Sequence, residues 1–113
     1  MTYILIHNPG CGSSKKGLEL LQSRGVAVTV RKYMTDRLSE AELRDIAAKM
    51  GVASPRSFLR EKDAEAAGVP ADASDDALFA AMAANPKIIQ RPIGLNGGRA
   101  VLGRPNDQLL TII

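Results

Sequence analysis

The hydrophobic pattern divides the first third of the chain into strand, helix and strand. Residues 3–6 form a short apolar run that is partly β-branched and ends at His-Asn-Pro-Gly, which predicts a buried strand. Ser13 and Ser14, either of which is a good N-cap, precede leucines at helical spacing, and Gly25 suits the end of that helix. Residues 26–32 alternate and are rich in valine, so they predict a second strand. This opening is predicted to be a βαβ unit.

The middle of the chain has a helical pattern. Ser-Glu-Ala-Glu at 39–42 is a capping box followed by apolar residues at helical spacing. Ser54-Pro55 predicts a second helix start, because serine caps well and proline is favoured at the first helical position. Residues 61–73 contain glycine and proline and predict an irregular connection. Ser74 begins a third helix that stops before Asn85-Pro86, since the residue before a proline is biased away from helix.

The end of the chain predicts a hairpin and a short helix. Apolar segments at 88–95 and 99–102 flank Asn-Gly-Gly, a hairpin signal, and Arg104-Pro105 begins a C-terminal helix. The order β-α-β, helices, β-β-α predicts an α/β fold with a mixed sheet covered by helices. We expect one domain over residues 1–113, with the helical region inserted at about 39–85.

Composition narrows the classes of function. The chain has 113 residues, and its net charge of +3 is spread along the sequence. Aromatic residues make up only 4%, so a nucleic-acid-stacking surface is not expected. The first ten residues lack the basic region of a signal peptide, and no stretch approaches a membrane span. We therefore expect a cytoplasmic protein with no nucleic-acid or membrane partner and no metal site.

The single cysteine lies in the segment HNPGCGSSKK, residues 7–16. With one cysteine there is no internal disulfide and no Cys-x-x-Cys pair. A cysteine at a helix N-terminus has its thiolate stabilised by free N–H groups and the helix dipole. Gly12, Ser13 and Ser14 follow Cys11 and are candidates to donate to a bound oxyanion. His7 could support the thiolate, although a buried packing cysteine and a loop histidine are the structural alternatives.

Three arginines occur in matching contexts beside apolar residues. Arg60 follows Phe-Leu, and Arg91 and Arg104 each precede a proline. An arginine is a planar donor suited to a tetrahedral oxyanion, and several around a cysteine would favour its thiolate. The pattern alone does not select these three, because six other arginines occupy the chain at positions 24, 31, 37, 44, 56 and 99.

The segments YILIHNPGCGSSKKGLELL, FLREKD, IIQRPI and VLGRPND together resemble the arsenate reductase family of the glutaredoxin-dependent, thioredoxin-fold type. The resemblance implies a thioredoxin-like fold with a helical insertion. It implies that Cys11 is the nucleophile and that His7 supports the lowered pKa of this thiol. It further implies that Pro92 is a cis-proline and that the oxyanion is bound by Arg60, Arg91 and Arg104.

The resemblance also implies a reaction. The Cys11 thiolate attacks arsenate, glutathione displaces the adduct, and glutaredoxin resolves the mixed disulfide. Glutathione is then a co-substrate, glutaredoxin is the partner and no cofactor is tightly bound; a monomer is expected. A single cysteine fits this scheme because the later thiols come from outside the chain. Lys15 and Lys16 stand where the family usually carries arginine and often asparagine.

Three other functions remain open from the sequence. A transcription regulator of the Spx type would share the fold and bind RNA polymerase, but most of these carry Cys-x-x-Cys where this chain has Ser14. A monothiol glutaredoxin-like protein would bind glutathione or an iron–sulfur cluster and carry Thr-Val-Pro where this chain has Arg91-Pro92-Ile93. A general thiol–disulfide protein is the third.

Overall fold

A mixed four-stranded sheet forms the centre of the molecule in the computed structural model, which describes residues 2–113. Its strands, in the spatial order β2-β1-β3-β4, are β2 (Val28–Lys32), β1 (Tyr3–His7), β3 (Ile93–Asn96) and β4 (Arg99–Leu102). The pair β1–β2 is parallel, and the pairs β1–β3 and β3–β4 are antiparallel. This is the predicted α/β class and the strand arrangement of a thioredoxin-like fold.

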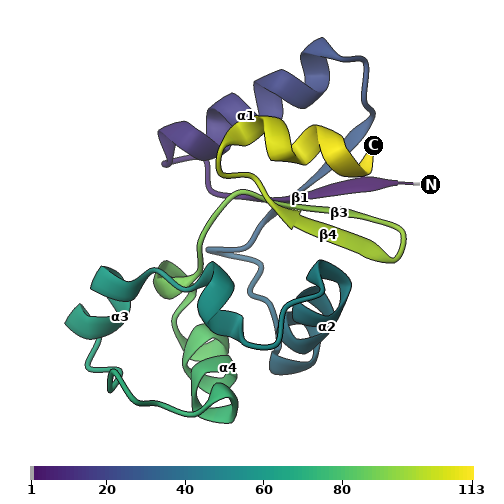
Figure 1. Cartoon of the computed structure of the whole chain (residues 1–113). Helices are drawn as coiled ribbons and strands as arrows, with labels where there is room; N and C mark the ends of the chain where they lie inside the picture. Colours follow the sequence, from purple (N-terminus) through teal and green to yellow (C-terminus); the bar gives the residue numbers. More distant parts are fainter. Residues whose placement is uncertain (1) are drawn as a thin grey trace.

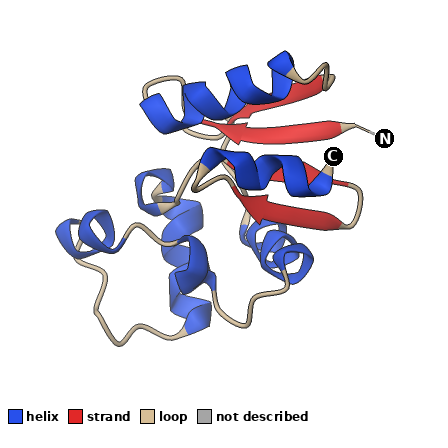
Figure 2. Ribbon diagram, turned by 45° about the horizontal axis from the view of Figure 1, so that its top comes forward, coloured by secondary structure: helices blue, strands red, loops and turns tan. Residues whose placement is uncertain are grey.

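Helices cover both faces of the sheet (Figure 1, Figure 2). One face carries α1 (Gly12–Ser23) and the C-terminal 3-10 helix η3 (Asn106–Ile112). The other lies against the segment between β2 and β3, which contains α2 (Glu40–Met50), the 3-10 helix η1 (Pro55–Phe58), α3 (Glu61–Ala66), α4 (Asp75–Ala84) and the 3-10 helix η2 (Pro86–Ile88). We call this segment the helical insertion.

Alternation along β1 explains the two cores. Successive side chains of a strand point to opposite faces of a sheet. Tyr3 and Leu5 accordingly pack in the cluster under α1 and η3, and Ile6 packs in the larger cluster under the helical insertion. His7, the next residue, returns to the α1 face, where it meets the first turn of that helix.

The register gathers four chain segments at one edge of the sheet. His7 at the end of β1 lies opposite Lys32 at the end of β2. Ile93 at the start of β3 lies opposite Ile6 and opposite Leu102 at the end of β4. The residues that follow β1, β2 and β4 and those that precede β3 therefore leave the sheet at the same edge, which we call the thiol edge.

The insertion departs from the predicted pattern in two places. The helix predicted from Ser54-Pro55 is only the 3-10 turn η1, because the chain becomes extended at Leu59 and forms a β-bridge with Ile89. The irregular connection predicted for 61–73 was wrong at its start, where α3 forms. Good helix formers occupy this segment, acidic residues lie in its first turn, and Ala64 anchors it in the core.

Other boundaries agree more closely. The capping box forms between Ser39 and Glu42, and α4 ends before Asn85-Pro86. The hairpin turns at Gly97-Gly98, but its first strand begins only at Ile93. Within the described residues, no helix combines the length and apolarity that crossing a bilayer requires.

Candidate active site

The thiol lies at the start of α1. Cys11 itself is the N-cap, with extended backbone angles (φ −107°, ψ 123°), and its carbonyl accepts the first helical bond from Lys15 N–H at 3.0 Å. The sequence prediction of Ser13 or Ser14 as N-cap was therefore wrong. The physical reason is that the Ser14 hydroxyl is taken by other partners, so no side chain caps the helix. The first-turn N–H groups remain available to the thiol and to a ligand.

The surroundings make Cys11 acidic. Burial alone would raise the pKa of its half-buried thiol. The backbone N–H groups of Ser14 and Ser13 and the guanidinium of Arg91 outweigh burial, and together they hold the pKa below that of a free cysteine. Nucleophilic attack requires the thiolate, so this arrangement raises the fraction of the reactive form at a given pH above that of a free cysteine.

His7 acts through Ser14. Its ring is buried, and Nδ1 lies 2.8 Å from Ser14 Oγ, which also accepts the Asn8 N–H at 3.0 Å. Burial and the nearby Lys32 charge lower the pKa of His7, so the ring is neutral at pH 7. Ser14 Oγ thus joins the ring of His7 and the backbone N–H of Asn8 to the first turn of α1. His7 thus fixes the turn whose N–H groups face the thiol.

Arg91, which precedes β3, and Arg104, which follows β4, lie beside the thiol. Arg104 Nη2 lies 3.9 Å from Cys11 Sγ, and Arg104 Nε donates to the Arg91 carbonyl at 2.9 Å. The Arg91 guanidinium lies beside the thiol and lowers its pKa. Nη1 of Arg91 makes only long contacts, at 3.4 Å, with the carbonyls of Lys87 and Ile89, and its buried Nε has no hydrogen-bond partner among the described residues.

Pro92 joins these arginines to α1. The Arg91–Pro92 peptide bond is cis, the geometry that the family resemblance implies, and the Arg104–Pro105 bond is cis as well. The Pro92 ring packs between Gly17 of α1 and Gly103. A Cβ added to Gly17 would lie 3.0 Å from Pro92 Cγ, and one added to Gly103 would lie 2.9 Å from it. Only glycine at these positions lets the segments approach so closely.

Arg60 stands at the margin of this group. It precedes α3, its Nε pairs with Asp63 Oδ2 at 2.6 Å, and its backbone N–H donates to the Ile88 carbonyl at 2.7 Å. The structure brings Cys11, Arg91 and Arg104 together, whereas the Arg60 guanidinium turns to Asp63. This ion pair is partly buried and joins residues three apart in the sequence.

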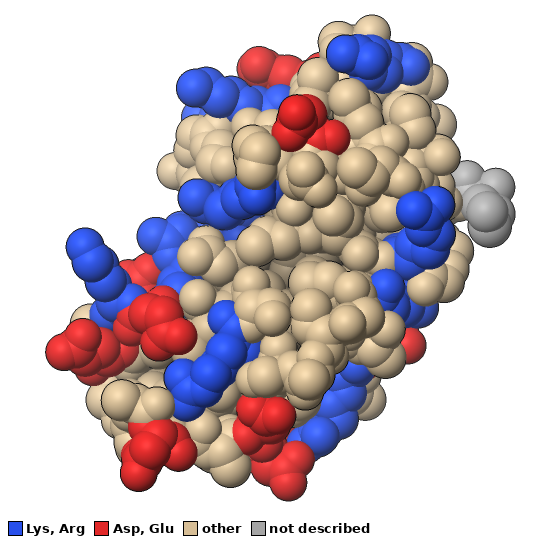
Figure 3. Space-filling model, in the orientation of Figure 1, with Lys and Arg blue, Asp and Glu red and all other residues tan. Residues whose placement is uncertain are grey.

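A shallow groove of about 280 Å³ runs past Arg104. It is lined by Leu59, Arg60, Glu61, Lys62, Asp63, Gln90 and Arg104. Figure 3 shows several Lys and Arg side chains on the side of the molecule where α1 begins. The thiol edge is therefore an open, cationic site that fits a small anion better than a large apolar ligand.

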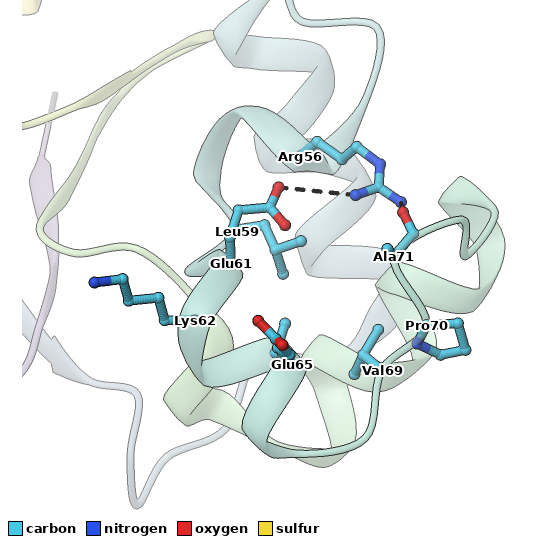
Figure 4. Close-up of a pocket in the computed structure, with 9 residues that line it drawn as sticks. Arg56, Leu59, Glu61, Lys62, Glu65, Val69, Pro70 and Ala71 are labelled. Carbon is cyan, nitrogen blue, oxygen red and sulfur yellow. Dashed lines mark hydrogen bonds and ion pairs between the residues drawn. The ribbon is translucent and has the colours of Figure 1, made fainter.

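A separate pocket of about 310 Å³ lies within the helical insertion (Figure 4). Arg56 spans its rim, pairing with Glu61 at 3.7 Å and donating to the Ala71 carbonyl at 2.8 Å. Its lining contains neither Cys11 nor any of the three predicted arginines. We do not assign the thiol chemistry to this pocket. Among residues 2–113, no cluster of three or more His, Cys, Asp or Glu side chains is suited to hold a metal.

Sequence reasoning missed two residues at the thiol edge. Asn106 Nδ2 donates to the carbonyls of Ser13 and Gly103, both at 3.0 Å, and so ties η3 to the first turn of α1. Tyr33 follows β2 directly, is fully buried, and its hydroxyl has no hydrogen-bond partner among the described residues. The available signal was topological: the residue after β2 must emerge beside the residue after β1 when the two strands are parallel.

The fold and the site define a thioredoxin-like protein with one acidic thiol placed among guanidinium groups. More particularly, the chain belongs to the ArsC family, whose family model matches residues 6–112. It is 38% identical to a protein of Neisseria meningitidis named arsenate reductase, over 96% of each chain, and 34% identical to one of that name from Haemophilus influenzae, over the whole of both. The solved arsenate reductase from Vibrio cholerae matches with a TM-score of 0.90 at 40% identity, covering 100% of this chain and 98% of that one. These matches confirm the family resemblance and the fold class.

Proposed function

We propose that the protein reduces arsenate to arsenite, with Cys11 as nucleophile and with glutathione and glutaredoxin as the external thiols. The observation that carries the proposal is the Cys11 thiol at the N-terminus of α1, with Arg104 at 3.9 Å and Arg91 beside it. The names of the family relatives from Neisseria meningitidis and Haemophilus influenzae support the choice of arsenate. The need for glutathione places the reaction in a reducing compartment, the cytoplasm.

The first step forms a sulfur–arsenic bond. Arsenate binds against the guanidinium groups of Arg91 and Arg104 and the first-turn N–H groups of α1, with Arg60 swinging from Asp63 to a third side. The Cys11 thiolate attacks arsenic, and one oxygen leaves as water after taking up protons. Arsenic remains As(V) in this adduct. The donors stabilise the charge on the arsenate oxygens during attack.

The second step reduces arsenic. A glutathione thiolate attacks Cys11 Sγ, a sulfur–sulfur bond forms, and the electron pair of the sulfur–arsenic bond passes to arsenic. As(V) becomes As(III), which leaves as arsenite, and the two thiols have supplied the two electrons. Glutaredoxin then attacks the glutathione sulfur of the mixed disulfide and frees Cys11. We place the approach of glutathione along the groove beside Arg104, where Lys62 and Arg104 suit its two carboxylates and Glu61 and Asp63 suit its ammonium group.

The test is a coupled assay. Wild-type protein with arsenate, glutathione, glutaredoxin and an NADPH-dependent glutathione-recycling system is expected to consume NADPH and to produce arsenite. Omitting glutaredoxin should slow turnover, and Cys11→Ser should abolish it. An absence of arsenite at saturating thiols, with a Cys11 that titrates like a free cysteine, would reject the proposal.

The site also separates the proposal from its rivals. The position that a second redox cysteine would occupy holds Ser14, whose buried hydroxyl is engaged by His7 and Asn8. The segment before β3 offers Arg91 to an anion. Co-purification with RNA polymerase would support a regulator, and a cluster-bearing protein from anaerobic purification would support a monothiol glutaredoxin.

A further inference from the structure

The thiol edge holds a polar group that the proposed mechanism does not use. We propose that the Tyr33 hydroxyl is a further ligand of the oxyanion held over Cys11 and donates a hydrogen bond to one of its oxygens. The inference rests on the proposed function, since it adds a binding group for the same substrate. It needs only that the site takes a tetrahedral anion, so it is testable apart from arsenate reduction.

Topology places Tyr33 at the site. It is the residue after Lys32, which lies opposite His7 in the parallel pair β1–β2. Its ring is fully buried in the cluster between the sheet and the helical insertion, which includes Phe58, Ile89 and Ile93. Phe58 and Ile89, which belong to the segments that lead into Arg60 and Arg91, are members of the same buried cluster as the Tyr33 ring.

The hydroxyl is an unusual feature of this core. Tyr33 Oη is buried and has no hydrogen-bond partner among the described residues, and the same holds for Arg91 Nε. Buried polar groups nearly always have a hydrogen-bond partner, because an unpaired one loses its hydrogen bonds to water and gains none in the protein. A phenylalanine would fill the same space without that penalty. Packing therefore explains the ring of Tyr33 and leaves its hydroxyl unexplained.

The charged neighbours of this hydroxyl are the residues of the candidate site. Burial raises the pKa of Tyr33. The Arg91 guanidinium lowers it, by its charge and by a contact with the hydroxyl that falls short of good hydrogen-bond geometry; the Arg60 charge lowers it too, and the Cys11 thiolate raises it. The net effect is upward from the ordinary tyrosine pKa of about 10, so the hydroxyl keeps its proton at neutral pH. It is then a neutral donor, next to the same Arg91 guanidinium that lies beside the thiol.

An oxyanion satisfies both unpaired groups at once. Arg91 Nε and Tyr33 Oη are donors, and an arsenate ion carries several acceptor oxygens. Arg91 and Cys11 both influence the pKa of Tyr33, so a ligand bound between the Arg91 guanidinium and the Cys11 thiol lies near the Tyr33 hydroxyl. A hydrogen bond to a charged ligand is among the stronger ones, and it forms here in a buried setting. The hydroxyl thus favours the bound state over the free protein.

The experiment compares Tyr33→Phe with Tyr3→Phe. Tyr3 is a matched control, because it is also buried but its hydroxyl donates to the Leu109 carbonyl at 2.8 Å, away from the thiol. Without ligand, Tyr33→Phe should keep or raise the melting temperature, and Tyr3→Phe should lower it. With Cys11→Ser as background, Tyr33→Phe should raise the dissociation constants of arsenate, phosphate and sulfate about ten- to hundredfold. Tyr3→Phe should leave them unchanged.

A spectroscopic measurement on unsubstituted tyrosines gives an independent readout. The chain has two tyrosines, so labelling with tyrosine that carries ¹³C at Cζ gives two signals, which Tyr3→Phe assigns. Addition of phosphate should shift the Tyr33 signal and leave the Tyr3 signal in place. This readout holds even if Tyr33→Phe fails to fold.

The outcomes separate the two proposals. If wild type reduces arsenate but Tyr33→Phe binds all three anions as tightly as before, the role of Tyr33 is overturned and the proposed function stands. If no arsenate is reduced but Tyr33→Phe weakens phosphate binding, the proposed function fails and the role of Tyr33 stands. Binding of none of the three anions, or a Tyr33 signal that ignores phosphate, overturns the role of Tyr33.

Discussion

Cys11 owes its acidity to backbone as much as to side chains. The N–H groups of Ser14 and Ser13 lower its pKa together with Arg91, and burial works against them. These N–H groups point at the thiol because Cys11 is itself the N-cap. Activation of the thiol is thus tied to the position where α1 begins, and a serine N-cap would have removed part of it.

The rate of alkylation should report this activation. We expect the rate of reaction of Cys11 with iodoacetamide to rise with pH along a single-proton curve whose midpoint lies below that of a free cysteine. The reaction needs the thiolate, so a lower pKa moves the curve to lower pH. Free glutathione, measured in parallel, is the reference. A midpoint at or above that of glutathione would contradict the activation.

The two arginines at the thiol should differ in their effects. Arg91→Ala and Arg104→Ala are each expected to weaken arsenate binding about tenfold or more, since a hydrogen bond to a charged group contributes about 1.5–3 kcal/mol. Arg91→Ala should also raise the pKa of Cys11, because its guanidinium is a cause of the lowered value. Isothermal titration and the alkylation curve measure the two quantities.

The control for this pair is Arg44→Ala. Arg44 pairs with Asp76 and lies over the Phe79 ring, 4.6 Å from its centroid, within the helical insertion. It should leave arsenate affinity and the pKa of Cys11 unchanged. Unaltered arsenate binding in both Arg91→Ala and Arg104→Ala would remove these arginines from the site.

At the scale of elements, α1 holds the site together by close packing. Its Gly17 faces Pro92, Leu109 and Asn106, which belong to the segments before β3 and after β4. The helix that supplies the N–H groups is therefore in direct contact with the residues next to Arg91 and Arg104. A shift of α1 by a few tenths of an ångström would alter both sets of donors together.

The glycines of α1 test this contact. Gly17→Ala should lower the free energy of unfolding by about 1–3 kcal/mol, because the added methyl group meets Leu109 Cδ1 at 2.9 Å and Pro92 Cγ at 3.0 Å. Gly12→Ala is the matched variant in the same helix, where the methyl group meets nothing within 4 Å, and should cause no such loss. Urea denaturation measures both. Equal stability of the two variants would show that Gly17 is not tightly packed.

At the scale of the whole molecule, the sequence predicts the elements better than it predicts which side chains meet. The strands, α1, α2, α4 and the thiol position follow from local pattern, because periodicity and capping act over a few residues. The convergence of Arg91 and Arg104 on Cys11 depends on strand register, and only the family resemblance singled them out. Tyr33 was missed because an aromatic residue after a strand predicts only core packing. Whether its hydroxyl has a hydrogen-bond partner depends on the tertiary structure, which local sequence does not show.

The buried histidine should make global stability depend on pH. The pKa of His7 is lowered in the folded protein, whereas it is near 6.5 in the unfolded chain. As pH falls below about 6.5, the unfolded chain takes up a proton that the folded protein does not, so stability declines until the folded pKa is passed. Urea denaturation between pH 7 and 5 should show this decline. His7→Asn cannot titrate and should flatten it, and an unchanged slope would contradict the assignment.

Both described ends of the chain lie away from the thiol. β1 begins at Tyr3, which pairs with Asn96 at the end of the sheet opposite the thiol edge, and Asn96 Nδ2 holds the Ile112 carbonyl at 2.6 Å (Figure 1, Figure 2). A linker attached to either end would therefore project from the rear of the molecule. Immobilised on an electrode or bead through such a linker, the protein should present Cys11 to the solution and alkylate at its free rate. The fold thus suits oriented attachment with the thiol facing the solution.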